Sequence, residues 1–445
     1  MNRRWLILLF FPFLAARAGA GELLSLRQAM DRAEKFGYDA AVAHAETDAA
    51  QADAHRSLSV FLPQIRIAST YTATNDPLNV FGMKLKEQRV TAADFNPDIL
   101  NHPDRFTQYT TRIELQQPLV NLDGFWGRAA AMDGARATEQ KELRTKRYTS
   151  FRVKMAYYEL VLARKSLGVL DTAYSAARSN AELAARSMEE GLINRSDYLF
   201  SRVRLLDVES KQADAANAVR NAESALRLLL GAADSTELIP TDTLSIPGAV
   251  PGAPNIDEIN STRSDMRAMQ FAVDASEEAL AMNRLKLLPT LNAFGSYGWN
   301  DQKMFGRQGP GWTIGAIAQW DIFPGFNHIA EIQKAGANLD RARTELERQR
   351  AQNRNDLESA FRTLESSRKR LGLSEETVFQ AAENYRILSE RFASGIGNTT
   401  DVLNAEASLA GARLQRLQTL FSYNATLFTI ELLTEHGLSQ PADQQ

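Results

Sequence analysis

Apolar residues recur at every seventh position along two stretches of the chain. The first series is Val153, Leu160, Leu167, Tyr174, Ala181 and Met188, and the second is Leu357, Leu364, Leu371, Val378, Tyr385 and Phe392. The second series repeats the first at an offset of 204 positions. A seven-residue repeat sustained in this way predicts a long α-helix that winds left-handedly on neighbouring helices. The chain is therefore expected to contain two long helical arms of one design.

A glycine-containing turn follows each arm. Residues 191–194 read Gly-Leu-Ile-Asn, and residues 394–398 read Ser-Gly-Ile-Gly-Asn. Apolar periodicity then resumes from Ser196 and from Thr399. Glycine just after a helix end, followed by asparagine at the next N-cap, is typical of a helical hairpin. Each arm is therefore expected to turn and run back.

Four shorter runs change to a period of two. They lie near residues 65–74, 109–116, 291–300 and 312–322, with apolar side chains on one face and mostly polar ones on the other. This alternation predicts β-strands and suits a wall between lipid and water. An ordinary antiparallel sheet with tryptophans in its core is the alternative. The aromatic residues suited to an interfacial girdle are Tyr71, Tyr109, Tyr297, Trp299, Trp312 and Trp320.

These patterns divide the chain into two repeats. The predicted segments are a signal peptide (1–20), a first repeat (21–230), a linker (231–254), a second repeat (255–436) and a disordered tail (437–445). Residues 77–104 are expected to form a long loop punctuated by prolines, and residues 255–288 a single helix. The signal peptide rests on Arg3 and Arg4, the short apolar run after them and alanines suited to cleavage. A membrane anchor is the alternative, but the apolar run is too short to span a bilayer.

Composition excludes several functional classes. Without residues 1–20 the chain has 48 basic and 54 acidic residues, a net charge of −6, which argues against a nucleic-acid partner. Cysteine is absent, so there is no disulfide and no lipidated N-terminal cysteine. The five histidines lack metal-ligand spacing, and no phosphate loop or nucleophile elbow occurs. We therefore expect no enzyme activity, no cofactor and no metal.

Neither the strands nor the arms can be complete in one copy. Four strands cannot close a barrel, because small closed barrels begin near eight strands and an open edge in lipid leaves backbone groups unpaired. A solitary amphipathic arm would expose its apolar seam. Both requirements predict a homo-oligomer that shares one barrel and one helical tube.

Here the sequence resembles the TolC family of outer membrane efflux proteins. The matching residues are the Leu-Pro pairs at 62–63 and 288–289, the segments 117–119 and 321–325, and the two hairpin tips. The resemblance implies an α+β membrane protein: a trimer with a twelve-stranded outer membrane barrel, four strands from each chain, continued by a periplasmic α-helical coiled-coil barrel. It also implies an outer membrane channel of a tripartite efflux or type I secretion system. The implied partners are a periplasmic adaptor, an inner membrane pump of the RND or ABC type, and outer membrane lipid.

The resemblance also implies a constriction at the tips. Asp401 matches an acidic family position that lines it, and the second such position is Asn404 here. One carboxylate ring would attract cations and resist anions. The alternative is that Asn398 is an N-cap and Asp401 stabilises the helix dipole at N3, as Asn194 and Asp197 would in the first hairpin.

Two further family features concern the tips. The family latches its closed state with a Tyr and an Arg, but Phe392 and Gly397 stand at those positions and cannot make the same hydrogen bonds. Asp197, the matching acidic partner, is then only a helix-start residue. Adaptor docking in the family uses small residues at the tips, which here are Gly191, Leu192, Ser196, Gly395, Ile396 and Thr400. The alternative is that the glycines are merely C-caps.

Two other classes compete with a channel. One is a trimeric coiled-coil structural or adhesive surface protein with a barrel anchor, and the other is a periplasmic enzyme on a helical scaffold. The duplicated design argues against the first, and the absence of a candidate active site argues against the second. The sequence does not identify the exported substrate, which could be a drug, a metal or a protein, nor the pump and adaptor.

Overall fold

The computed structural model describes residues 21–232, 236–246, 252, 255–394 and 396–435. The predicted signal peptide, the predicted tail and Gly395 therefore lie outside the described residues. The chain divides into two compact units, each built from separate segments. We call residues 44–143 and 260–351 the sheet unit, and the described residues of 1–43, 144–259 and 352–445 the tip unit. Each sequence repeat contributes to both units.

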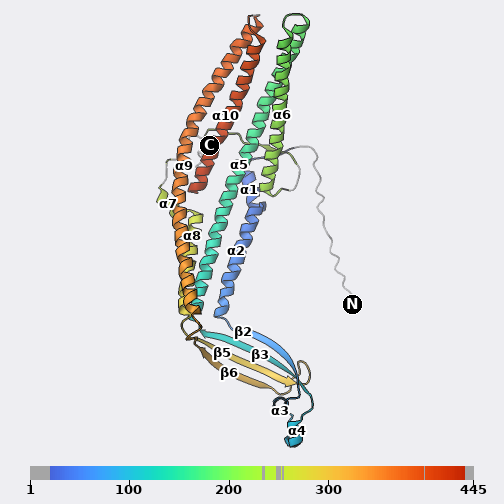
Figure 1. Cartoon of the computed structure of the whole chain (residues 1–445), viewed down its shortest axis with the longest axis vertical. Coiled ribbons are helices and arrows are strands. Elements are labelled where there is room, and N and C mark those ends of the chain that lie inside the picture. Colours follow the sequence, from blue (N-terminus) through green and yellow to red (C-terminus); the bar gives the residue numbers. More distant parts are fainter. Residues whose placement is uncertain (1–20, 233–235, 247–251, 253–254, 395, 436–445) are drawn as a thin grey trace, which may run out of the picture. The chain divides into compact units, whose positions relative to one another are not determined.

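The order of elements occurs twice along the chain, which confirms the internal repeat (Figure 1). In each copy a helix leads into two strands, and the second strand leads into a long helix that turns into a shorter one. The first copy is α2 (Tyr38–Arg56), β2 (Gln64–Thr74), β3 (Phe106–Val120), α5 (Leu122–Glu189) and α6 (Arg195–Leu230). The second is α8 (Ser264–Leu285), β5 (Thr290–Asp301), β6 (Gly311–Gln319), α9 (Asn327–Ala393) and α10 (Thr399–Thr434). At about 1.5 Å per residue, the 68-residue α5 is roughly 100 Å long.

The expected loop at residues 77–104 is wrong, because this segment contains three short helical elements. They are α3 (Pro77–Lys86), a 3₁₀ turn (Ala92–Phe95) and α4 (Pro97–Asn101). The prolines begin helices here rather than excluding them. The Asp76 carboxylate caps α3 by accepting from Asn79 N–H (2.9 Å), and Asn96 caps α4 in the same way. A proline at the first helical position loses no hydrogen bond and has a suitable φ.

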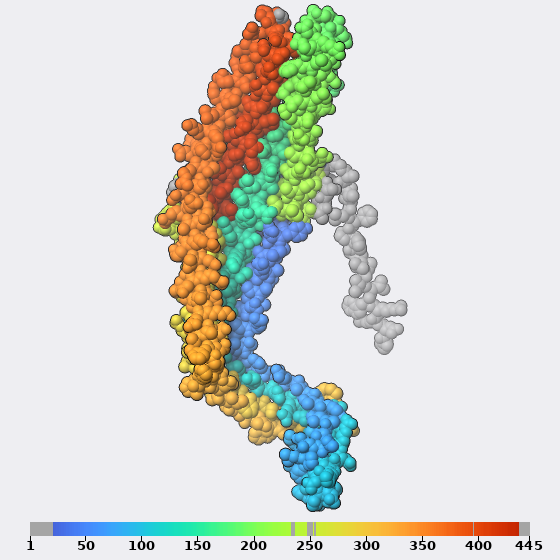
Figure 2. Space-filling view, in the orientation of Figure 1, coloured from blue at the N-terminus to red at the C-terminus, as the bar shows by residue number. Residues whose placement is uncertain are grey.

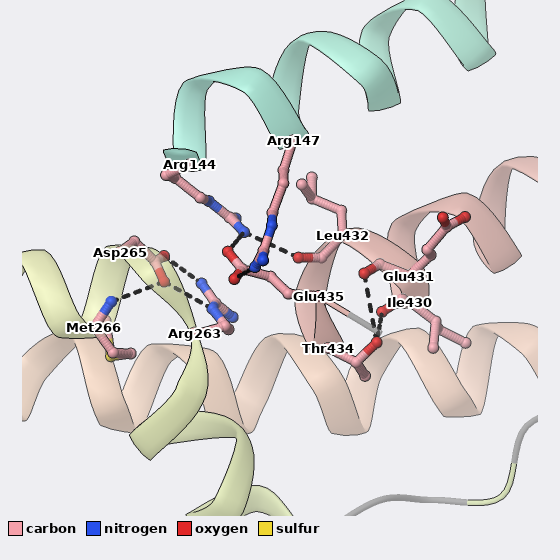
Figure 3. A network of polar contacts seen from close by, with 10 residues as sticks. All are labelled: Arg144, Arg147, Arg263, Asp265, Met266, Ile430, Glu431, Leu432, Thr434 and Glu435. Carbon is pink, nitrogen blue, oxygen red and sulfur yellow. Dashed lines mark hydrogen bonds and ion pairs between the residues drawn. The ribbon is translucent and has the colours of Figure 1, made fainter. Parts of the chain in front are cut away.

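Other boundaries also differ from the prediction. Residues 238–240 of the expected linker form strand β4, which pairs in parallel with β1 (Glu22–Leu24). The helix expected over residues 255–288 is divided into α7 (Ile256–Thr262) and α8, since Arg263 between them has an extended backbone. The Arg263 side chain pairs with Asp265 through Nε and Oδ1 (2.8 Å; Figure 3). Trp320 lies just beyond the end of β6.

The sheet unit contains one antiparallel sheet with the strand order β2-β3-β5-β6. Its register places Ile67, Ile113, Tyr297 and Trp312 in one row across all four strands. The neighbouring row on the opposite face holds Arg66, Glu114, Ser296 and Thr313. The predicted apolar and polar faces are therefore confirmed. The apolar face is open in a single chain, since Ile67 is 66% exposed and Trp312 is 72% exposed.

The seam of the tip unit alternates large and small side chains. Leu357, Leu364 and Leu371 of α9 are buried, and the remaining members of the series are partly buried. The positions three residues after each of these leucines are Ala360, Ser367 and Ser374, which are also buried. In α5, alanine occupies most of the equivalent positions. Large and small residues that alternate along one helix face allow a neighbouring helix to approach closely.

The Tyr157 hydroxyl joins the two-stranded sheet to α5 inside the tip unit. Its ring is fully buried, and its oxygen lies 2.8 Å from Leu24 O and 2.7 Å from Asp242 Oδ2. It also accepts from the backbone N–H groups of Thr241 and Asp242 at 3.1 Å. Burial raises the pKa of Tyr157 to about 12. The hydroxyl therefore stays protonated and connects three chain segments.

Two cations close the end of α10. Arg144 Nη1 donates to Leu432 O (2.9 Å) and to Glu435 Oε1 (3.0 Å), and Arg147 pairs with the same carboxylate (Figure 3). Glu435 adopts a left-handed conformation with φ of 54° and ends the helix. Positive charge at a helix C-terminus interacts favourably with the terminal carbonyl groups.

Among the described helices, none is long and apolar enough to cross a membrane.

Replacing Tyr157 by Phe should lower the free energy of unfolding by about 1–3 kcal/mol, since Asp242 and two backbone N–H groups would lose a buried partner. Guanidinium titration of the detergent-solubilised protein, followed by circular dichroism, measures this change. Tyr148→Phe is the control, because Tyr148 is 48% exposed. Equal stability of the two variants would contradict a connecting role for Tyr157.

Candidate functional site

The two hairpin tips both lie in the tip unit and end in different turns. At the first, Gly191 has φ of +75°, and Leu192 N–H donates to Ser187 O (2.8 Å), which closes α5. At the second, Ile396 N–H donates to Arg391 O (3.0 Å) and closes α9. Asn398 then caps α10 by accepting from Thr400 N–H (2.9 Å). The glycine and asparagine signals in the sequence thus coincide with the ends and starts of these helices.

Gly397 lies directly on the backbone of Phe392. A Cβ atom at residue 397 would come within 2.7 Å of both N and Cα of Phe392, which no side chain allows without a backbone shift. The arginine that the family latch requires at this position would therefore need a different turn. Sequence reasoning identified the missing arginine, and the close backbone approach gives the physical reason for glycine.

The Phe392 side chain is partly buried between the two hairpins. It lines a small pocket together with residues from the end of α5, from the first turn and from the start of α10. The lining includes Leu183, Ala184, Ile193, Val402 and Leu403. Apolar packing thus occupies the place where the family latch has a tyrosine.

One side-chain hydrogen bond crosses between the hairpins near this pocket. Asn180 Nδ2 of α5 donates to Glu406 Oε2 of α10 at 2.8 Å. Burial raises the pKa of Glu406, while Asn180 and the nearby positive charge of Arg204 act in the opposite direction. Arg204 itself pairs with Asp207 on α6 (2.6 Å). Sequence reasoning did not find this contact, because neither residue belongs to a motif and 226 positions separate them.

Asp401 and Asn404 lie on one exposed face of α10. Asp401 is the third residue of the helix, so its carboxylate is placed to interact with the N-terminal end of the dipole. Asp197 occupies the third position of α6 and is partly buried. The helix-start interpretation therefore agrees with the geometry of both residues. The Asp401 side chain is exposed in the single chain.

The tip residues considered for docking are mostly exposed. Leu192 is 71% exposed and Ile396 is 74% exposed, so each tip presents one aliphatic side chain. Gly191 and Ser196 are also exposed, and Thr400 is partly buried. Gly395 belongs to the same predicted set but lies outside the described residues.

The predicted girdle residues share the apolar face of the sheet. Five of them lie within three consecutive rows near the β2–β3 end, where the Tyr71 and Tyr109 rings are 5.0 Å apart and those of Tyr297 and Trp299 are also 5.0 Å apart. Trp320 lies beyond the other end of β6, where its Nε1 donates to Leu287 O (3.0 Å). Trp320 lies eight positions after Trp312, or about 26 Å of extended chain. In a strand tilted by about 40° this length would span a height of roughly 20 Å.

The outer membrane efflux protein family model matches residues 37–232 and 255–434, which are the two repeats. The chain belongs to the outer membrane efflux protein family. AprF of Pseudomonas aeruginosa, an alkaline protease secretion protein, is 21% identical over 343 residues, covering 76% of this chain and 70% of AprF. CyaE of Bordetella pertussis is 25% identical over 268 residues, covering 58% of this chain and 56% of CyaE.

The fold has close counterparts among solved structures. The CmeC outer membrane channel of Campylobacter jejuni matches with a TM-score of 0.78 at 17% identity, covering 94% of this chain and 87% of CmeC. This likeness shows the fold. Together with the family assignment, it confirms the TolC-like resemblance, the α+β class and the location in the outer membrane with a periplasmic extension. This outer membrane efflux protein is a channel of efflux or type I secretion systems, and its family consists of conduits rather than enzymes.

Replacing Gly397 by Ala should loosen the second tip of this efflux protein, because the new Cβ would displace the Phe392 backbone. Amide hydrogen exchange across residues 388–404 should become faster. Gly411→Ala is the matched control on the same hairpin, since nothing lies within 4 Å of the Cβ it adds. Unchanged exchange in both variants would contradict the packing described for Gly397.

Proposed function

We propose that three copies of this chain close a twelve-stranded barrel and continue it as a helical tube. The open apolar face of the four-stranded sheet is the observation that carries this proposal. Within the described residues, β2 and β6 each pair with a strand on one side only. In lipid, an apolar face is favourable but an unpaired strand edge is costly. Pairing β6 of one copy with β2 of the next would give hydrogen-bond partners to the backbone groups of both strand edges.

The barrel and tube would act as a passive conduit from the periplasm to the outside. A periplasmic adaptor and an inner membrane pump would deliver the cargo at the hairpin tips, and the exposed Leu192 and Ile396 support docking there. AprF is named for secretion of an alkaline protease, which favours polypeptide cargo for this chain. The polar sheet face, with Arg66, Glu114 and Ser296, would face the water-filled interior.

Asp401 would form a ring of three carboxylates where the second hairpins converge. Asn404, one turn further along the same face, adds hydrogen-bonding groups but no charge. The constriction would therefore favour cations through a single ring. Adaptor contact would lie next to this ring, at Ser196 and Thr400 and the glycines of the two turns.

The hydrogen bond between Asn180 and Glu406 would hold the hairpins together in place of the latch that Phe392 and Gly397 cannot make. It joins α5 to α10 within one copy, close to the apolar Phe392 pocket. Movement of one hairpin away from the other would break this bond and expose the pocket. The aperture at the tips would then depend on the strength of this hydrogen bond and of the packing around Phe392.

Replacing Asp401 by Asn should reduce the cation preference of the channel in planar bilayers. A unit charge about 4 Å from an ion in water contributes about 1 kcal/mol, so the permeability ratio should fall roughly two- to fivefold. Asp197→Asn is the control, because it alters the third position of the other tip helix. Silence of the unmodified protein, or a mass in detergent that does not correspond to three chains, would overturn the proposed channel.

Replacing Asn180 by Ala should increase the time that single channels spend open. Losing a partly buried hydrogen bond of about 1 kcal/mol corresponds to roughly a fivefold change in the ratio of open to closed states. Gln212→Ala is the matched control, since Gln212 Nε2 donates to Asp171 Oδ1 (2.7 Å) inside the first hairpin. If both variants open alike, the contact between hairpins does not set the aperture.

A further inference from the structure

An uncharged polar stripe follows one face of α10 on the C-terminal side of Asp401. Its positions alternate by four and three residues, the spacing of a heptad seam, but none of its members is large and apolar. All members are exposed except Ser422, which is partly exposed. The neutral stripe consists of Asn404, Ser408, Gly411, Gln415, Gln418 and Ser422. At about 1.5 Å per residue it extends for roughly 27 Å along the helix.

The charged residues of α10 in this range lie off the stripe, and two of them have partners on other helices. Glu406 accepts from Asn180 on α5, and Arg416 pairs with Glu375 on α9 (3.1 Å). Arg413 is exposed on the side of the helix opposite the stripe. The absence of charge along the stripe therefore does not reflect the composition of the whole helix.

Other helices of the tip unit expose different chemistry. α6 exposes an aliphatic row, in which Val203 is 64% exposed, with Leu199 and Leu206 beside it. This row suits burial against another protein surface. α9 exposes many charged residues, including Glu365, Arg368, Lys369 and Glu376, together with Leu373 (60% exposed) and Phe379 (65% exposed). The charged residues suit bulk water.

The neutral stripe fits neither of these surroundings. A face buried against another helix would be apolar, as on α6, and a face open to bulk water would be charged, as on α9. Amide and hydroxyl groups without charge hydrogen-bond to water and to solutes of either sign. Figure 2 shows part of α10, in red, at the surface between α9 and α6.

We propose that the neutral stripe lines the permeation pathway inside the helical tube and passes cargo of either charge, so that along α10 charge selection is confined to the Asp401 ring. The inference rests on the proposed channel. It adds the position on α10 beyond which the pathway no longer selects cargo by charge. Fixed charges along a narrow pathway would bind cargo of the opposite sign and repel cargo of the same sign. A stretch without charge does neither, which suits an extended polypeptide with side chains of both signs.

Single cysteine substitutions along α10 test this inference in the complete channel. The chain contains no cysteine, so every introduced thiol is the only one in its subunit. The test variants are N404C, S408C, G411C, Q415C, Q418C and S422C. R413C is the control, because it lies on the opposite face of the same helix at the same depth. The probes are two methanethiosulfonates, one with a trimethylammonium group and one with a sulfonate.

Both reagents should lower the single-channel conductance of every stripe variant, in up to three discrete steps, and should leave R413C unchanged. Between positions 408 and 422 the two reagents should react at similar rates. At position 404, beside Asp401, the cationic reagent should react faster, and the difference should disappear when D401N is added.

The outcomes separate the inference from the proposed channel. A channel that conducts normally but is not blocked at the stripe, or is blocked equally in R413C, would overturn the lining assignment. Reaction with only one reagent along the whole stripe would overturn the charge tolerance. Absence of conductance before any labelling would instead overturn the channel itself.

Discussion

The backbone groups along the outer edges of β2 and β6 constrain the rest of the structure. The sheet turns an apolar face outward across all four strands, with Ile67 and Trp312 in the same row, and lipid can cover such a face. Lipid cannot supply hydrogen bonds to a strand edge. One chain leaves these edges unpaired within the described residues. The proposed closure by identical copies would account for the small number of strands per chain and for the different chemistry of the exposed helix faces.

Packing in the tip unit follows from alternating residue size. Leucines at every seventh position of α9 are followed three residues later, on the same face of the helix, by a buried alanine or serine, and these small side chains allow a neighbouring helix to approach closely. Close packing also occurs at the second tip, where Gly397 lies against the Phe392 backbone. A tip built on backbone contact and one apolar pocket has few polar interactions to break. The Asn180–Glu406 hydrogen bond is therefore prominent there.

Periodicity was sufficient to predict the long helices, the four strands and the faces of the sheet, because these depend on patterns repeated over many residues. It failed where structure depends on single residues. Asp76 and Asn96 turn a segment rich in prolines into short helices, and a three-residue strand such as β4 has no measurable period. Among the candidate site residues, Asp401 is predicted from its place in a motif. The Asn180–Glu406 pair was not, since nothing local connects residues 226 positions apart.

The end of α10 has a practical consequence for anyone who modifies this chain. Arg144 and Arg147 both direct their guanidinium groups to the carboxylate of Glu435, whose side chain is only 4% exposed. A truncation that removes Glu435 would deprive two neighbouring cations of their shared carboxylate and leave their mutual repulsion uncompensated. Affinity tags and reporter fusions should therefore begin after Glu435 and preserve it.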